Sequence, residues 1–249
     1  MKRLLYPIIL AIFFSACSSK TPYTNRSQMI FISQKEEFKL GEESYKKALS
    51  ESEIVSSGAE FERVKRVATR IADATAMSEF KWEFNLVKDD LANAYCLPGG
   101  KIVVYTGILK YAHNDDQLAT VISHEVAHAL ARHGAERMSQ AMIQQSVGAV
   151  GDLALSIFSP QTRGVFNQVY GVGTNLGVML PYGRMQESEA DEIGIHLMHQ
   201  AGYNIHEAVK FWENMSSGGG SKTPQFLSTH PSSSTRIEDI KKVINRIGQ

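Results

Sequence analysis

The chain has 249 residues, of which 43 % are hydrophobic and 9 % aromatic, and this is enough apolar material for a packed core. Its 26 Lys and Arg residues balance its 26 Asp and Glu residues, so it lacks the surplus of positive charge that nucleic-acid binding requires. Two cysteines exclude a disulfide framework, and no second long apolar run follows the one at the N-terminus. Extensive disorder, a nucleic-acid partner and a multi-span membrane protein are therefore excluded.

The first 16 residues have the pattern of a secretory signal peptide. Lys2 and Arg3 precede an apolar stretch, Leu4 to Phe14, which is too short to span a membrane and ends in small residues. The alternative is an uncleaved interfacial helix, and the abrupt polar stretch after Cys17 argues against it. The sequence therefore predicts a signal peptide over residues 1–16.

Cys17 ends a Phe-Ser-Ala-Cys segment that resembles the bacterial lipobox, in which the cysteine becomes N-terminal and acylated. Two or more acyl chains suffice for stable anchoring, at about 0.8 kcal/mol per buried CH₂. Ser18 behind the cysteine indicates the outer membrane in a cell with two membranes. We therefore expect an envelope lipoprotein that faces the periplasm, in which residues 17–32 form the lipidated end and a polar tether.

The remaining chain, residues 33–249, is predicted to form one domain. Apolar spacing and capping residues predict helices over residues 33–49, 61–72, 115–132, 184–200, 208–215 and 237–247. Alternation predicts a strand at 82–86, and a hairpin over 93–105 turns at Pro98-Gly99-Gly100. Residues 140–181 favour a packed helical hairpin, with a lid or a membrane-facing element as the alternative.

Residues 124–128 have the pattern H-E-x-x-H within the expected helix 115–132. Four-residue spacing places the imidazoles of His124 and His128 on one helix face, where they can hold one Zn²⁺. Glu125 is turned by about 100° from His124, so it can lie beside the metal and take a proton from the attacking water. The alternative is a helix with surface histidines, against which the small apolar neighbours argue.

A catalytic zinc site usually has three protein ligands and one open position, so a third ligand is required. The acidic helix further along the chain offers Glu187, Glu189 and Glu192, and spacing alone does not choose among them. A solvated acidic helix face is the alternative. Asp191 lies one turn from Glu187 and is placed to orient a ligand imidazole. A metzincin site is excluded, because Gly134 stands where its third histidine would be.

Several short motifs follow one another in a characteristic order along the chain. They are Leu40-Gly41, Asn93-Ala94, Pro98-Gly99-Gly100, Tyr105-Thr106-Gly107, the H-E-x-x-H motif, Arg184 with Glu187-Ser188-Glu189-Ala190-Asp191, and Thr229-His230-Pro231 with Arg236. Together they resemble the M48 peptidase family, most closely its lipoprotein-borne, Oma1-like branch. The resemblance implies an α+β, mostly α-helical zincin-like metalloprotease domain with a small antiparallel β-sheet.

The resemblance also implies roles for single residues. It implies one Zn²⁺ held by His124, His128 and Glu187, with Glu125 as general base and Asp191 as support for a ligand.

His230, Arg236 and the histidines outside the H-E-x-x-H motif can also bear on the site. His230 follows a flexible loop and can reach the open zinc position or stabilise the oxyanion, with a simple turn histidine as the alternative. Arg236 can bind a substrate carbonyl or pair with a core acid, and the pairing is favoured. His133 and the remaining histidines are expected to be surface or core residues without a second ligand at suitable spacing.

Asn93 and Ala94 bear on how a substrate would bind. An exposed strand edge there would bind extended polypeptide through main-chain hydrogen bonds, whereas the alternative is an ordinary paired strand. We expect a zinc-dependent endopeptidase that acts on unfolded or misassembled envelope proteins. The competing hypothesis is a non-catalytic, chaperone-like scaffold with a structural zinc that His230 would close.

Overall fold

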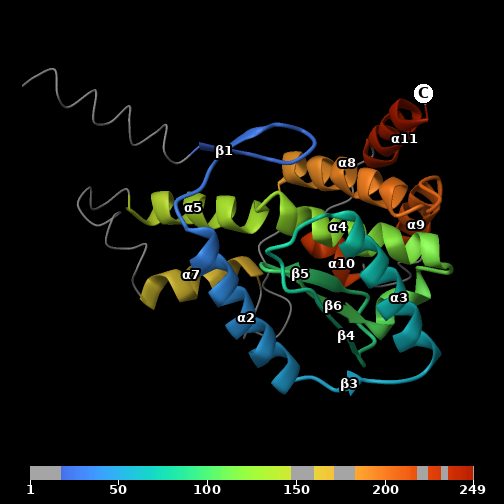
Figure 1. Cartoon of the computed structure of the whole chain (residues 1–249), viewed down its shortest axis with the longest axis horizontal. Helices are drawn as coiled ribbons and strands as arrows, with labels where there is room; N and C mark the ends of the chain where they lie inside the picture. Colours follow the sequence, from blue (N-terminus) through green and yellow to red (C-terminus); the bar gives the residue numbers. More distant parts are fainter. Residues whose placement is uncertain (1–17, 147–159, 171–182, 218–223, 231–234, 249) are drawn as a thin grey trace, which may run out of the picture.

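The computed structural model describes residues 18–146, 160–170, 183–217, 224–230 and 235–248, in which helices surround a small sheet (Figure 1). Within these residues the helices are α2 (Gln34–Ser50), α3 (Ala59–Ala74), η1 (Thr106–Lys110), α4 (Asp115–Leu130), α5 (His133–Ser146), α7 (Pro160–Tyr170), α8 (Arg184–Gln200), α9 (Glu207–Ser217), α10 (Gln225–Thr229) and α11 (Arg236–Ile247). The expected α+β class with mostly helical content is confirmed.

The central sheet has four strands in the order β3-β4-β6-β5. Its strands are β3 (Ile54–Val55), β4 (Glu83–Val87), β5 (Ala94–Leu97) and β6 (Lys101–Tyr105). The expected hairpin is confirmed, since β5 and β6 pair antiparallel and the turn uses Gly99 and Gly100 at positive φ. The sheet is nevertheless mixed, because the hairpin brings β6 back beside β4 in the same direction.

Both faces of the sheet are buried, so β6 is apolar along most of its length. Ile102 and Val104 belong to the core with α3, α4, α8 and α9. Val103 and Tyr105 face the other core, which α2, α5 and α7 complete. Because side chains alternate along a strand, β6 contributes to both cores, and helices therefore cover both faces of the sheet.

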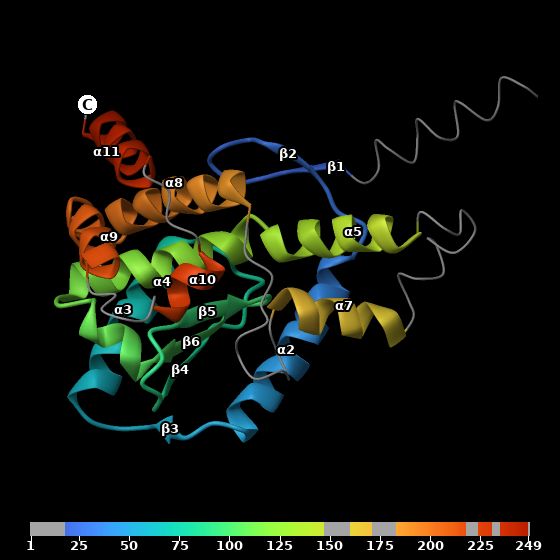
Figure 2. The ribbon, with the colours of Figure 1, turned by 180° about the vertical axis from the view of Figure 1, so that it is seen from behind.

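Helix α4 lies between the sheet and α8 (Figure 2). It begins as expected, since the Asn114 side chain accepts a hydrogen bond from the Gln117 N–H at 2.8 Å. It ends at Leu130 rather than beyond Arg132, because Arg132 adopts the left-handed conformation with φ of 54°. Helix α5 then starts at His133 in a new direction, which decides where that histidine lies.

Helix α2 packs on the turn of the β5–β6 hairpin. The predicted cap is present, because Ser33 Oγ accepts a hydrogen bond from the Glu36 N–H at 3.2 Å. A Cβ at Gly41 would lie 2.4 Å from the Pro98 carbonyl oxygen, so only glycine fits this approach. The close approach of α2 to this turn therefore depends on Gly41.

The first described residues are folded, whereas the sequence predicts a tether there. Strands β1 (Ser18–Lys20) and β2 (Ser27–Met29) pair antiparallel, and we call residues 18–29 the N-terminal hairpin. Gln28 Nε2 donates to the Ala131 carbonyl at 2.8 Å, and the Phe31 N–H donates to Ser139 Oγ at 2.9 Å. These polar contacts dock residues 18–32 on the end of α4 and on α5. The expected signal peptide and Cys17 lie outside the described residues.

The later elements agree with expectation where the structure describes them. Helix α8 ends before Gly202, whose φ of 71° is typical of a helix stop, and α9 and α11 follow. Of the interval 140–181, the structure describes the end of α5 and α7; residues 147–159 and 171–182 lie outside it. Within the described residues, none of the helices combines the length and apolarity needed to cross a membrane.

Candidate metal centre

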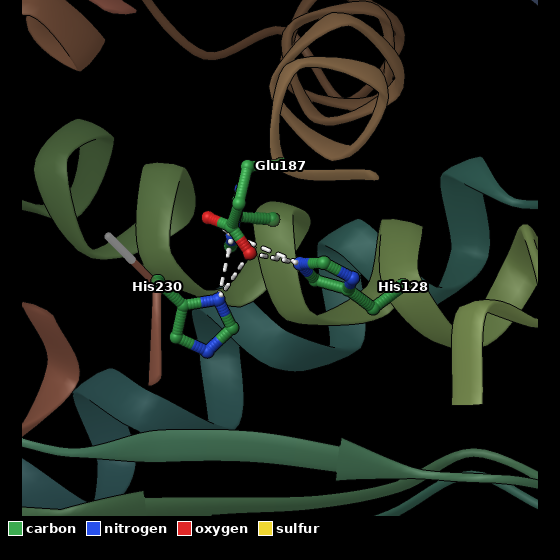
Figure 3. Close-up of side chains that lie close together, drawn as sticks. His128, Glu187 and His230 are labelled. Carbon is green, nitrogen blue, oxygen red and sulfur yellow. Dashed lines mark hydrogen bonds and ion pairs between the residues drawn. The ribbon is translucent and has the colours of Figure 1, made fainter. Parts of the chain in front are cut away.

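Four buried side chains converge on one point, and Figure 3 shows three of them, His128, Glu187 and His230. His124 and His128 come from the middle of α4, Glu187 from the first turn of α8, and His230 directly follows α10. One donor atom from each lies within 4.8 Å of all the others. His124 Nε2 lies 3.1 Å from His128 Nε2 and 3.2 Å from His230 Nδ1. The structure thus brings together the residues expected to bind metal, with His230 as a fourth.

Glu187 supplies the oxygen donors of this cluster. Its Oε1 lies 3.0 Å from His230 Nδ1 and 3.4 Å from His128 Nε2. Burial would raise the pKa of Glu187, but the His230 charge and the imidazole hydrogen bonds hold it well below its usual range. Burial lowers the pKa of His128 well below its ordinary value. An ionised carboxylate beside imidazoles is the donor set that Zn²⁺ takes in proteins, so the residues fit this metal.

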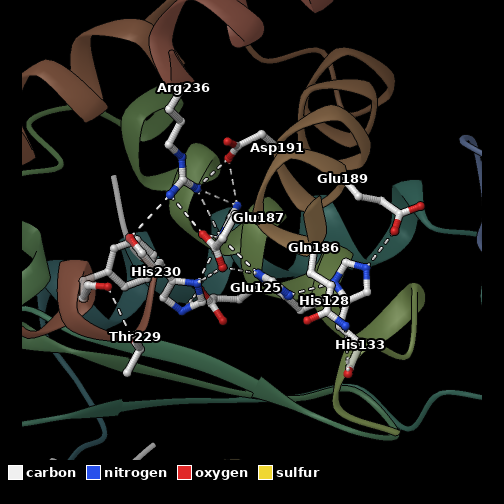
Figure 4. A network of polar contacts seen from close by, with 12 residues as sticks. Glu125, His128, His133, Gln186, Glu187, Glu189, Asp191, Thr229, His230 and Arg236 are labelled. Carbon is white, nitrogen blue, oxygen red and sulfur yellow. Dashed lines mark hydrogen bonds and ion pairs between the residues drawn. The ribbon is translucent and has the colours of Figure 1, made fainter. Parts of the chain in front are cut away.

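Glu125 lies beside the cluster and outside its donor set (Figure 4). It is buried, and its Oε1 is 3.2 Å from His230 Nε2. Burial raises the pKa of Glu125 to about 7, with a further upward contribution from Glu187, while His230 and Arg236 act in the opposite direction. A carboxyl group whose pKa lies near neutrality can accept and release a proton at that pH.

Asp191 and Arg236 support the cluster from the side of α8 and α11. Asp191 Oδ1 lies 3.0 Å from His124 Nδ1, so His124 directs its Nε2 to the centre. Arg236 donates to Asp191 at 2.7 Å and to Glu187 at 3.0 Å, and its guanidinium stacks on Trp212 at 3.4 Å. Of the two roles expected for Arg236, the geometry shows the pairing with core acids; substrate binding by Arg236 stays a prediction.

His133 contacts the centre, although the sequence predicts no role for it there. The side chain is fully buried, and its Nδ1 lies 2.8 Å from His128 Nδ1. Its Nε2 lies 3.0 Å from Glu189 Oε2. Glu189, left open as a ligand by spacing, thus faces His133 instead. In a continuous helix His133 would point about 140° away from His128, so no spacing signal marks this contact.

Asn93 and Ala94 lie at the edge of the sheet, as expected, but they are not exposed. Strand β5 is the last of the sheet, yet Ala94 is only 2 % accessible. Helix α10 packs against the start of this edge, since the Phe226 N–H donates to the Ala92 carbonyl at 2.9 Å. Phe226 also stacks on His230, with ring centroids 4.5 Å apart. The same short helix therefore lies beside the residues that lead into this strand and places His230 in the cluster.

Comparisons with known proteins agree with this geometry. The chain is 35 % identical over 226 residues to the mitochondrial metalloendopeptidase OMA1 of Schizosaccharomyces pombe, covering 89 % of this chain and 65 % of that protein. It is 33 % identical over 260 residues to the protein of the same name in Saccharomyces cerevisiae, covering 94 % and 73 %. For the beta-barrel assembly-enhancing protease of Escherichia coli, identity is 30 % over 171 residues, covering 67 % and 35 %.

The chain thus spans less than two thirds of the fission yeast relative and about a third of the bacterial one. The model of peptidase family M48 matches residues 58–244, which include every member of the metal cluster. On this evidence the chain belongs to peptidase family M48.

Proposed function

We propose that the chain is a zinc-dependent endopeptidase that hydrolyses peptide bonds of unfolded or misassembled proteins in the cell envelope. The observation that carries this proposal is the buried convergence of His124, His128 and Glu187 with Glu125 beside them. The names of the relatives support it, since they are metalloendopeptidases and a protease named for beta-barrel assembly. One metal ion per chain fits the single cluster found in the described residues.

Each residue of the proposed site has a separate role in peptide-bond hydrolysis. A bound zinc ion would supply Lewis-acid polarisation of the scissile carbonyl and of the attacking water. Glu125 takes the proton of the water at its carboxylate and delivers it to the leaving amine, which its pKa of about 7 suits. Asp191 holds the His124 ring in the orientation that points Nε2 to the metal. His230 is close enough to the donors to donate to the developing oxyanion.

Polypeptide binding is proposed along β5. Ala94 and Cys96 alternate with the residues that bond to β6, so their main-chain groups point to the free edge. An extended substrate could add there as a further strand. Because α10 is bonded to Ala92 just before this edge, the added strand would lie next to the segment that carries His230.

The decisive experiment compares the unmodified chain with Glu125→Gln in the presence of zinc. We expect the unmodified chain to cleave an unfolded protein such as casein, and Glu125→Gln to lower the rate by about 10²–10⁴-fold while zinc content stays at one per chain. The surface variant Glu192→Gln serves as the matched control and should cleave normally. Equal cleavage by Glu125→Gln would remove that residue from the mechanism.

The presence of His230 in the cluster favours one alternative. Structural zinc sites are closed by four protein ligands, and the cluster offers four buried donors. A chaperone-like scaffold with structural zinc would keep unfolded protein from aggregating without cleaving it. His230→Ala separates the two functions, because an endopeptidase should keep its zinc on His124, His128 and Glu187 and still cleave, although more slowly without the oxyanion donor, whereas a scaffold should lose zinc affinity and show no cleavage.

We further propose that residues 1–16 are removed and that Cys17 is lipidated, which would anchor the protein to the outer membrane facing the periplasm. The folded hairpin begins at Ser18, so the anchor would lie next to the folded body. Cys17→Ser should move the protein from the membrane fraction to the soluble fraction. Retention in the membrane fraction would favour the uncleaved-helix alternative.

A further inference from the structure

A second row of polar contacts runs from the metal centre toward the N-terminal hairpin, away from Asp191 and Arg236 (Figure 4). It consists of His128, His133, Glu189 and Arg26, the last of which lies in the loop between β1 and β2. We propose that His133, Glu189 and Arg26 are positioning residues for His128, so that the N-terminal hairpin is part of the apparatus that holds the metal. This inference rests on the proposed function, since it requires a bound metal.

The hydrogen-bond directions along the row are consistent with a metal-binding His128. Its Nε2 faces the cluster, so its Nδ1 is left to face His133. A neutral imidazole has one donor and one acceptor. If His128 carries its proton on Nδ1, then His133 must accept at Nδ1 and donate from Nε2, and Glu189 Oε2 lies 3.0 Å from that nitrogen. Every nitrogen is thereby satisfied with the His128 lone pair directed at the metal.

Glu189 is fixed at the far end of this row by the hairpin. Arg26 Nε donates to its Oε2 at 2.6 Å, and Thr21 Oγ1 donates to its Oε1 at 2.6 Å. Thr24 donates to the same Oε1. Arg26 is held in turn by a bidentate pair with Glu136, at 2.7 and 2.9 Å. The carboxylate that orients His133 therefore takes most of its donors from residues 21–26.

The burial of His133 and Glu189 argues for a role beyond helix packing. His133 is fully buried and Glu189 is buried as well, and desolvating such groups costs more than packing apolar side chains of equal size. A purely packing role would not need an acceptor opposite Nδ1 of His128. Acceptors of this kind fix the ring orientation and tautomer of ligand histidines, and their loss lowers metal affinity by about 10–100-fold.

The test measures zinc affinity of the full chain, purified in detergent, by competition with a chelating indicator. We expect His133→Leu to raise the zinc Kd by about 10–100-fold, Glu189→Gln by a smaller factor, and His133→Asn to restore part of the loss because its amide oxygen can accept from His128. Glu192→Gln is the matched control, since it removes a pair of similar length from α8 that does not reach His133. The zinc Kd of Glu192→Gln should stay unchanged.

A second measurement needs no variant. Long-range ¹H–¹⁵N NMR of the zinc-loaded chain with labelled histidine should show His128 protonated at Nδ1 and His133 at Nε2. The opposite tautomers, or an unchanged Kd in a folded His133→Leu, would overturn the proposal. Failure of the unmodified chain to bind zinc would instead overturn the proposed function, so the two failures are distinguishable.

Discussion

The two imidazoles of α4 are supported in different ways. His124 meets Asp191 directly, and Arg236 behind it is almost fully buried, with its side chain 4 % exposed. His128 meets another imidazole first, and the guanidinium at the end of its row, Arg26, is 19 % exposed. Arg236 also bonds to the metal-binding cluster itself, whereas Arg26 acts only at a distance. The support of His124 is thus short and shares Arg236 with the metal-binding cluster. The support of His128 is longer, and its arginine is partly exposed to water.

The largest effect should come from removing the buried guanidinium. Arg236→Met leaves the carboxylates of Asp191 and Glu187 without their common partner. Removing one partner of a buried ion pair costs about 3–5 kcal/mol, so the free energy of unfolding of the metal-free chain should fall by that amount. Urea denaturation at neutral pH measures it. A loss below about 1 kcal/mol would show that water replaces the arginine.

Removal of the outer guanidinium should cost less. After Arg26→Met, Glu189 still accepts hydrogen bonds from Thr21, Thr24 and His133. Hydrogen bonds to charged groups contribute about 1.5–3 kcal/mol, and solvent compensates part of this at Arg26. The same denaturation experiment should therefore place Arg26→Met between Arg236→Met and the unmodified chain. A loss equal to that of Arg236→Met would abolish the distinction between the two supports.

The parts of this site that depend on short-range spacing were predictable. His124 and His128 are one helical turn apart, and Asn114 caps their helix. The third ligand was not, because Glu187, Glu189 and Glu192 share one helix and differ only in what the fold places opposite them. In the structure these carboxylates face the metal cluster, His133 and Arg246 respectively. Only the family resemblance selected Glu187 from the sequence.

The contact of His133 with His128 was not predicted, because it depends on a break between α4 and α5. Arg132 takes the left-handed position where glycine is usual, so the sequence carries no stop signal between α4 and α5. With the helix extended past Arg132, His133 would face away from His128. The parallel pairing of β4 with β6 was missed for a similar reason, since alternation predicts a strand and says nothing of its direction.

The stabilities of the Arg236 and Arg26 variants are best compared above about pH 5. Below that pH another carboxylate, Glu207, which belongs to neither support, also changes the free energy of unfolding. Hydrogen bonds from Lys210, Asn114 and Gln117 lower the pKa of Glu207 to about 2. A depressed folded-state pKa gives stability that is present above the unfolded value of about 4.3 and is lost as the pH falls from there toward 2. The stability difference between the unmodified chain and Glu207→Gln, about 1 kcal/mol at pH 6, should therefore shrink at pH 3. A constant difference would contradict the shifted pKa.

The smallest effect is expected at Arg246, which joins the same two helices as Arg236. Arg246 donates to Glu192 at 2.7 Å, the same distance as Arg236 to Asp191. Its side chain is 61 % exposed, however, and exposed pairs contribute about 0–1 kcal/mol. Arg246→Met should thus lower the free energy of unfolding by less than about 0.5 kcal/mol. A loss comparable to Arg236→Met would mean that distance, and not burial, determines what an ion pair between α8 and α11 is worth.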